Sequence, residues 1–178
     1  MSRISPGFAS QEDTHVPFST DAGVGATVLE INRAADASTR VILKTTTAAL
    51  SLTEAAHAGR IVVLNAVFTA AQTITLPAAT GTGNIYTIVN NAVQTVDGVT
   101  VTALAGDTLT ASLSNVHSAT TAAADSFVSA TTHILYKWNV TTTGGLGGDK
   151  LVAIDLATDS WFFTVNSMGS GTLATGFA

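Results

Sequence analysis

The chain has 178 residues and a mass of 18.0 kDa, enough for one domain with a sizeable hydrophobic core. Its formal net charge of -5 and the absence of any Lys/Arg cluster exclude the basic stripe of a nucleic-acid-binding protein. They argue equally against binding to an anionic membrane surface. The chain contains no cysteine, so disulfides, thiolate zinc sites and thiol catalysis are excluded.

Residues 1–26 are polar, show no periodicity and are interrupted by Pro and Gly. Three apolar side chains, Phe8, Val16 and Phe18, are scattered among them. We interpret the segment as an extended N-terminal arm that docks on a partner; a disordered tail is the alternative. It contains no apolar signal-peptide core, so we expect synthesis in a cytoplasm and release by lysis or another route.

The rest of the chain predicts many short strands separated by turns. Apolar patterns predict strands at residues 27–32, 40–47, 61–68, 73–77, 85–91, 107–113 and 133–140, and hairpins within residues 93–104 and 151–166. Asp97-Gly98 is the strongest hairpin signal, and it is typical of a two-residue type I′ turn. The segment 114–130 is either an Ala-rich helix or a surface loop. We therefore predict an all-β protein, an antiparallel β-sandwich or barrel-like domain over residues 27–178, without a repeat of fixed period.

Two segments near the middle of the chain have more specific patterns. Ser51 and Glu54 fit a capping box, and Gly59 is suited to end a short helix over residues 52–58. Residues 61–68, IVVLNAVF, are apolar almost throughout and predict a strand buried on both faces. This apolar run is the longest in the chain, and it falls far short of the ~20 residues that a membrane span requires.

The composition of the surface predicts association with other proteins. Charged residues make up only 11% of the chain, against about 25% in typical domains. Thr and Ala dominate the remainder, and such side chains lose little rotamer entropy when a partner covers them. We expect a homo-oligomer or a packed assembly; a monomer with a Thr-rich surface is the alternative.

The candidate chemistry of the chain is weak. His15, His57, His117 and His133 lack the spacing of metal ligands, and no two carboxylates are identified as a catalytic pair. Residues 144–152 match one copy of a calcium-binding nonapeptide, but one copy supplies a single carboxylate and Ca²⁺ takes six to eight oxygens. We interpret this segment as a Gly-rich loop ahead of a strand, and we predict no catalytic residue, no metal and no cofactor.

The aromatic residues near the C-terminus allow two interpretations. Tyr136, Trp138, Trp161, Phe162 and Phe163 alternate along predicted strands. Such residues are core or subunit-interface residues more often than a platform for sugar binding. A carbohydrate-binding module or a hydrolase nevertheless remains an alternative.

About half of the chain resembles tailed-bacteriophage virion proteins. The resemblance rests on Leu52-Thr53 with Gly59, on Val62 to Asn65, on Thr73 to Val89, and on a closing hairpin with Trp161. Similar sequences occur in capsid decoration (cement) proteins and in fibre or baseplate components. The compact domain and polar arm, without heptads or repeats, are closer to a decoration protein.

The resemblance implies a trimeric β-fold on the outer surface of the capsid, where it would bind the major capsid protein across capsomers and stabilise the shell. The partners would be other copies of the chain and the capsid protein, not nucleic acid or membrane. We expect the arm to make the capsid contact, through Arg3, Phe8, His15, Val16 and Phe18. A tail fibre, baseplate or receptor-binding virion protein is the alternative role.

Overall fold

The computed structural model describes residues 40–94, 98–117, 124–170 and 172–178. All of them belong to the second of the two units into which the chain divides, Ser38–Ala178. The predicted arm at residues 1–26 and the predicted strand at residues 27–32 lie outside the described residues.

The described residues form two β-sheets and one short helix, α2 (Glu54–His57), so the all-β prediction is confirmed. The larger sheet has the order β1 (Val41–Lys44), β3 (Ile61–Leu64), β5 (Ile85–Asn90), β10 (Lys150–Ala157), β11 (Ser160–Gly169), β7 (Thr108–His117) and β8 (Ala124–Val128). The smaller has the order β2 (Leu50–Ser51), β4 (Gln72–Thr75), β6 (Val99–Thr102) and β9 (Leu135–Trp138). Within the described residues, no helix is long and apolar enough to cross a membrane.

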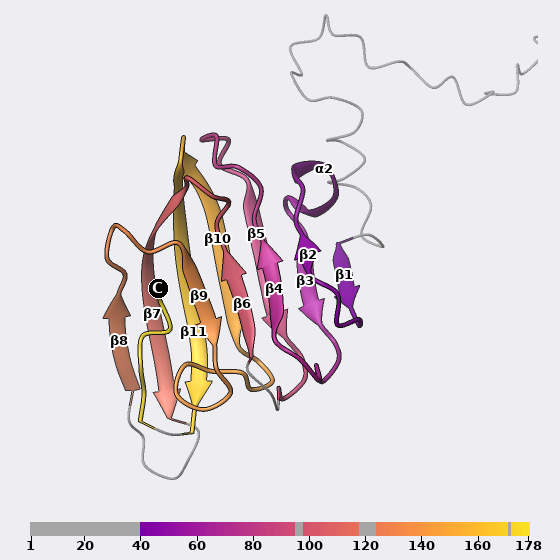
Figure 1. Ribbon diagram of the computed structural model, residues 1–178, viewed down its shortest axis with the longest axis vertical. Coiled ribbons are helices and arrows are strands. Elements are labelled where there is room, and N and C mark those ends of the chain that lie inside the picture. Colours follow the sequence, from indigo (N-terminus) through magenta and orange to yellow (C-terminus); the bar gives the residue numbers. More distant parts are fainter. Residues whose placement is uncertain (1–39, 95–97, 118–123, 171) are drawn as a thin grey trace, which may run out of the picture. The chain divides into compact units, whose positions relative to one another are not determined.

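The first six strands form a coil (Figure 1). The chain alternates between the sheets, so β1, β3 and β5 lie parallel in the larger sheet and β2, β4 and β6 lie parallel in the smaller. Each turn of the coil thus adds one strand to each sheet. Val41 is paired with Ile61 and Ile61 with Thr87, so successive turns differ in length and leave no fixed period in the sequence.

The remaining strands add the antiparallel pairs. β10 lies antiparallel to both β5 and β11, β8 to β7, and β9 to β6. The sheets are therefore mixed and open, rather than antiparallel or closed into a barrel. The difference from the prediction has a simple cause: a strand that returns to its sheet by way of the other sheet runs parallel to its predecessor. Turn signals between strands do not distinguish this path from a hairpin.

Three local predictions require correction in whole or in part. Asp97 of the hairpin predicted at Asp97-Gly98 lies outside the described residues, but β6, which follows Gly98, is paired on both sides, with β4 and β9, and the preceding strand β5 belongs to the larger sheet, so β6 is not an arm of a hairpin at this turn. The short helix predicted over residues 52–58 is confirmed as Glu54–His57, but its N-cap is Thr53, whose hydroxyl accepts a hydrogen bond from the Ala56 N–H, and not Ser51, which belongs to β2. In the segment 114–130, the described residues form the end of β7 and the whole of β8, which pair with each other, where a helix or a surface loop was predicted; residues 118–123 lie outside the described residues.

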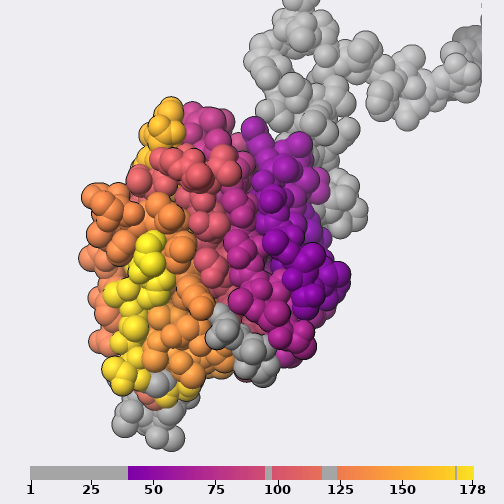
Figure 2. All heavy atoms as spheres, viewed as in Figure 1, coloured from indigo at the N-terminus to yellow at the C-terminus, as the bar shows by residue number. Residues whose placement is uncertain are grey.

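One hydrophobic core fills the space between the sheets. Its largest members are aromatic, with Tyr86 against the edge of Trp161 and Tyr136 against Trp138. The interpretation of Tyr136, Trp138, Trp161 and Phe163 as core residues is confirmed. The C-terminal residues, yellow in Figure 2, extend the smaller sheet beyond β9, where Gly176 and Ala178 accept backbone hydrogen bonds.

Candidate functional site

The buried carboxylates are the first groups to consider for chemistry, because three aspartates lie almost fully inside the domain. Asp107 accepts hydrogen bonds from the Ala79 N–H at 2.9 Å and from the Trp161 indole N–H at 3.2 Å. Asp155, on β10, accepts bonds from the turn at residues 80–82. Both side chains hold loops against the core, and their oxygen atoms face donors of the protein itself.

Asp149 has the same role in the Gly-rich loop. Its Oδ2 accepts hydrogen bonds from the N–H groups of Gly145 at 2.6 Å and Leu146 at 3.1 Å, and its Oδ1 accepts one from Met168 at 2.8 Å. Burial nevertheless raises the pKa of Asp149 to about 6. The carboxylate closes its own loop, as expected for a Gly-rich loop ahead of β10 and not for a calcium site.

The described histidines lie apart. His57 bonds to Thr53 at the start of α2, His133 stacks on Phe177, and His117 ends β7. His15 lies outside the described residues. Among the residues that the structure describes, no three His, Asp or Glu side chains are grouped so that they could hold a metal ion.

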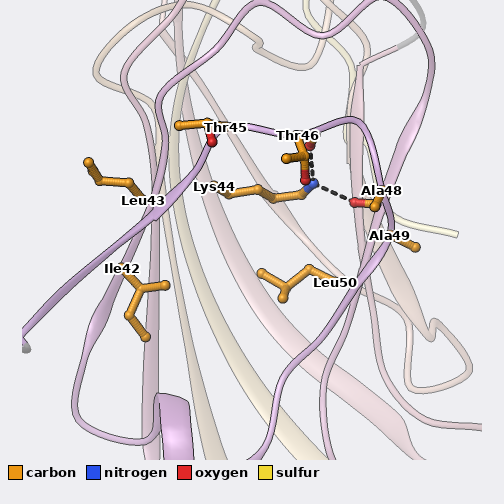
Figure 3. A pocket seen from close by; sticks show the side chains of 8 residues that line it. All are labelled: Ile42, Leu43, Lys44, Thr45, Thr46, Ala48, Ala49 and Leu50. Carbon is orange, nitrogen blue, oxygen red and sulfur yellow. Dashed lines mark hydrogen bonds between the residues drawn. The ribbon is translucent and has the colours of Figure 1, made fainter.

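Lys44 is the most unusual charged residue of the domain. Its side chain is 6% exposed and points across a hollow of about 160 Å³ toward Thr46 and Ala48 (Figure 3). The ammonium donates to the carbonyls of these residues at 2.7 and 2.6 Å and to the Gln72 side-chain oxygen at 3.1 Å. It also lies 4.8 Å from the centre of the Phe68 ring.

This arrangement assigns Lys44 a structural role. Burial lowers its pKa, as it does for catalytic lysines. An ammonium has three N–H donors, however, and each of the three faces an acceptor of the protein. Lys44 therefore fixes the loop between β1 and β2 and has no donor left for a substrate.

A sugar-binding platform needs exposed aromatic rings, and the described part of the chain does not present them in a row. Tyr86, Tyr136, Trp138, Trp161 and Phe163 are buried. Phe162 is partly exposed, but its neighbours Trp161 and Phe163 point into the core.

The outer face of the seven-stranded sheet, which is the face turned away from the core, has a more distinctive composition. Its outward positions on β1, β3, β5 and β10, together with the adjoining position on β11, are apolar almost throughout. We call these residues the apolar half of the outer face: Val41, Leu43, Ile61, Val63, Ile85, Val89, Val152, Ile154 and Phe162. Four of them, Val41, Leu43, Ile61 and Ile85, are 38–58% exposed.

The strand register brings these side chains together. Val41 and Ile61 are paired, as are Ile85 and Ile154, and Ile154 in turn is paired with Phe162. Side chains directly opposite on neighbouring strands are in contact distance. The apolar half is therefore a continuous surface and not a set of isolated residues.

The remainder of the outer face, on β11, β7 and β8, is built mainly from small polar residues. Thr164 is paired with Ser112, and Asn166 with Ser114, which is paired with Ser126. Lys150 is the one ionisable side chain at the outward positions of the described strands of this sheet. The outer face of the smaller sheet differs, because Thr73, Thr75, Thr100 and Thr102 occupy it.

The sequence prediction for residues 61–68 requires a correction here. Val62 and Leu64 are buried, but Ile61 is 38% exposed, because no layer of the described protein covers the outer face. The predicted contact residues Arg3, Phe8, His15, Val16 and Phe18 lie outside the described residues. Sequence reasoning missed the outer face as a site, although strands with apolar residues on both faces were the signal for it.

No known protein family, no curated protein and no solved structure matches this chain.

Proposed function

We propose that the protein is a structural component of a bacteriophage head, a decoration protein that binds the outer surface of the capsid and stabilises the assembled shell. The observation that carries this proposal is the broad, nearly uncharged outer face of the seven-stranded sheet, with its continuous apolar half. Exposed apolar patches of this kind mark surfaces at which proteins associate.

The interior of the domain supports a structural role rather than an enzymatic one. Among the residues that the structure describes, the buried charged ones are Asp107, Asp149, Asp155 and Lys44, and their partners are loops of the same domain. A catalytic group has to face a substrate with at least one free donor or acceptor. In the described part of the chain, these four side chains stabilise the fold through their hydrogen bonds to loops.

The resemblance of residues 52–89 and of the hairpin around Trp161 to tailed-phage virion proteins favours the phage setting. In this setting the polar segment at residues 1–26 acts as an arm that reaches across capsomers, with Arg3, Phe8, His15, Val16 and Phe18 as its contact residues. Apolar area buried at such contacts contributes roughly 25 cal/mol per Å². A protein that binds only the assembled shell stabilises that shell by mass action.

Co-sedimentation tests the proposal. Purified protein is mixed with DNA-filled heads from which the protein has been stripped, and bound copies are counted. We expect saturable binding at a fixed number of copies per head. Absence of binding by the wild type contradicts the decoration role, and labelling of the tail instead of the head supports the fibre or baseplate alternative.

Two variants of the arm and one control variant test the role of the arm. Deletion of residues 1–20, or the full-length double variant Phe8→Ser/Phe18→Ser, should abolish or weaken binding to heads. Thr100→Ser, on the outer face of the smaller sheet, should leave binding unchanged. If the deletion variant retains full occupancy, the arm is not the capsid contact.

A further inference from the structure

We propose that the outer face of the seven-stranded sheet is the contact surface between copies of this chain. The inference rests on the proposed role as an assembly protein and identifies the surface through which the copies associate. Strands that are apolar on both faces are typical of sheets covered on both sides. In β3, Val62 and Leu64 face the core while Ile61 and Val63 face outward, so the second cover has to come from outside the described domain.

Charge favours a second copy as the occupant. Lys150 is the one ionisable side chain at the outward strand positions of the described sheet, so this face offers a charged partner almost nothing to pair with. Two identical faces meet without extended like-charge repulsion, because the single charge, on Lys150, lies at the border of the apolar half, between Val89 of β5 and Asn166 of β11. An uncharged face that is apolar in part is complementary to itself.

The size of the face is also appropriate. Seven strands about 4.8 Å apart and roughly 20 Å long cover about 600 Å² in projection, and side-chain relief increases the accessible area. A stable interface buries about 800 Å² on each partner. The apolar half alone is too small, so the contact has to extend over the Ser/Thr half.

The two halves correspond to the usual anatomy of an interface, which has an apolar centre and a polar, hydrated rim. The apolar half supplies the centre. The Ser/Thr half contains a shallow hollow of about 320 Å³ along β8, β7 and β11, lined by Ser112, Ser126 and Thr164 and also by apolar side chains, among them Val128, which is 78% exposed. Hydroxyl groups and bridging water fill the polar part of such a rim at little cost in affinity, because water-mediated hydrogen bonds are nearly as favourable as direct ones.

Sedimentation velocity of the full-length protein tests the inference with matched substitutions. Ile85→Glu places a carboxylate in the apolar half, at a side chain that is 45% exposed. Ile134→Glu makes the same change at a side chain that is 44% exposed and precedes β9 of the smaller sheet. We expect an oligomer for the wild type and for Ile134→Glu, and the monomer mass of 18.0 kDa for Ile85→Glu.

A monomeric wild type at all soluble concentrations overturns the inference, and so does an unchanged oligomer in Ile85→Glu. Dissociation of Ile134→Glu to the same extent also overturns it, because the effect would then not depend on the outer face. Far-UV circular dichroism of each variant reports on folding.

A second measurement does not depend on disrupting the surface. The chain has no cysteine, so a single introduced thiol reports on one position. Thr87→Cys lies on the outer face between Ile61 and Val152, and Thr100→Cys lies on the outer face of the smaller sheet; both threonines are half-buried in the single chain. We expect alkylation of the Thr87→Cys variant to slow as the protein concentration rises, while alkylation of the Thr100→Cys variant stays constant. Equal and constant rates overturn the inference.

The failure of this inference is distinguishable from that of the proposed function. An oligomer that Ile85→Glu dissociates but that does not bind heads supports the contact surface and contradicts the decoration role. A wild-type monomer that binds heads saturably supports the decoration role and contradicts the contact surface.

Discussion

Asp155 and Thr82 are joined by two hydrogen bonds, in which the Thr82 N–H and hydroxyl donate to Oδ2 at 3.1 and 2.6 Å. The N–H groups of Thr80 and Gly81 donate to Oδ1 at 2.9 and 2.7 Å. Burial raises the pKa of this carboxyl, but these bonds outweigh burial and hold the pKa below its ordinary value. β10 thereby holds the turn that precedes β5.

We expect Asp155→Asn to lower the free energy of unfolding at pH 7 by about 2–3 kcal/mol, because an amide NH₂ would face N–H donors that then lose their acceptor. Urea denaturation measures the loss, and Asp125→Asn, an exposed position on β8, is the control with an expected change within about 0.5 kcal/mol. Equal stability of the two variants would contradict the role of Asp155.

The same substitution has a defined pH dependence. A carboxyl with a folded pKa below its unfolded value contributes stability above the unfolded pKa, and this contribution disappears as the pH falls through the folded pKa. The ordinary value is 3.8. The difference between the wild type and Asp155→Asn should therefore be constant from pH 7 down to about pH 4 and should shrink below it.

The contribution of Asp149 to the free energy of unfolding should change with pH in the opposite direction. Its pKa is raised from 3.8 to about 6, so between these values the folded chain binds more protons than the unfolded chain. The free energy of unfolding then falls as the pH rises through this window, by about 3 kcal/mol. Asp149→Asn cannot titrate, so its stability relative to the wild type should rise between about pH 4 and pH 7. Urea denaturation across this range provides the test, and a constant difference would mean that the pKa of Asp149 is not raised.

The sequence predicted the β class and several individual strands for a physical reason. Alternation shows which side chains are buried, as in residues 133–140, where Tyr136 and Trp138 are buried as expected. It carries no information on which strand lies beside which, and the coil from β1 to β6 depends on that pairing alone. The alternation of apolar residues therefore could not predict whether neighbouring strands run parallel or antiparallel.

The buried carboxylates were partly predictable. Along β10, Asp155 alternates in step with Leu151 and Ala153, which face the core. The alternation therefore predicts a buried carboxylate, and a buried carboxylate needs hydrogen-bond donors. Its donors lie about 75 residues away in the chain, at residues 80–82, where only the fold brings them close. The apolar half of the outer face was also indicated by the sequence, because residues 61–68 are apolar at positions that face both sides of a strand. The sequence does not show, however, that no other part of the described chain covers the outer side.

Lys44 offers a test of the loop between β1 and β2. Lys44→Met retains the length of the side chain but removes the donors to Thr46, Ala48 and Gln72, so buried acceptors lose their partner. We expect a loss of about 1–3 kcal/mol in the free energy of unfolding, with faster amide exchange at residues 45–49. Lys137→Met, on the half-buried Lys137 of β9, is the control and should change neither quantity much. Unchanged exchange in Lys44→Met would contradict the role of the ammonium in holding the loop.

Gly98 and Gly83 allow a direct test of the close approach between β6 and β9. Both have a φ of +72°, a left-handed value that disfavours other residues, so Ala at either position carries the same backbone strain of about 1 kcal/mol. At Gly83 an added Cβ meets nothing within 4 Å, whereas at Gly98 it would lie 1.4 Å from the Trp138 carbonyl oxygen. We expect Gly83→Ala to lower the free energy of unfolding by about 1 kcal/mol and Gly98→Ala by more than about 4 kcal/mol, or to prevent folding. Urea denaturation of both variants measures the difference, and equal losses would show that the backbone around Trp138 moves aside at little cost.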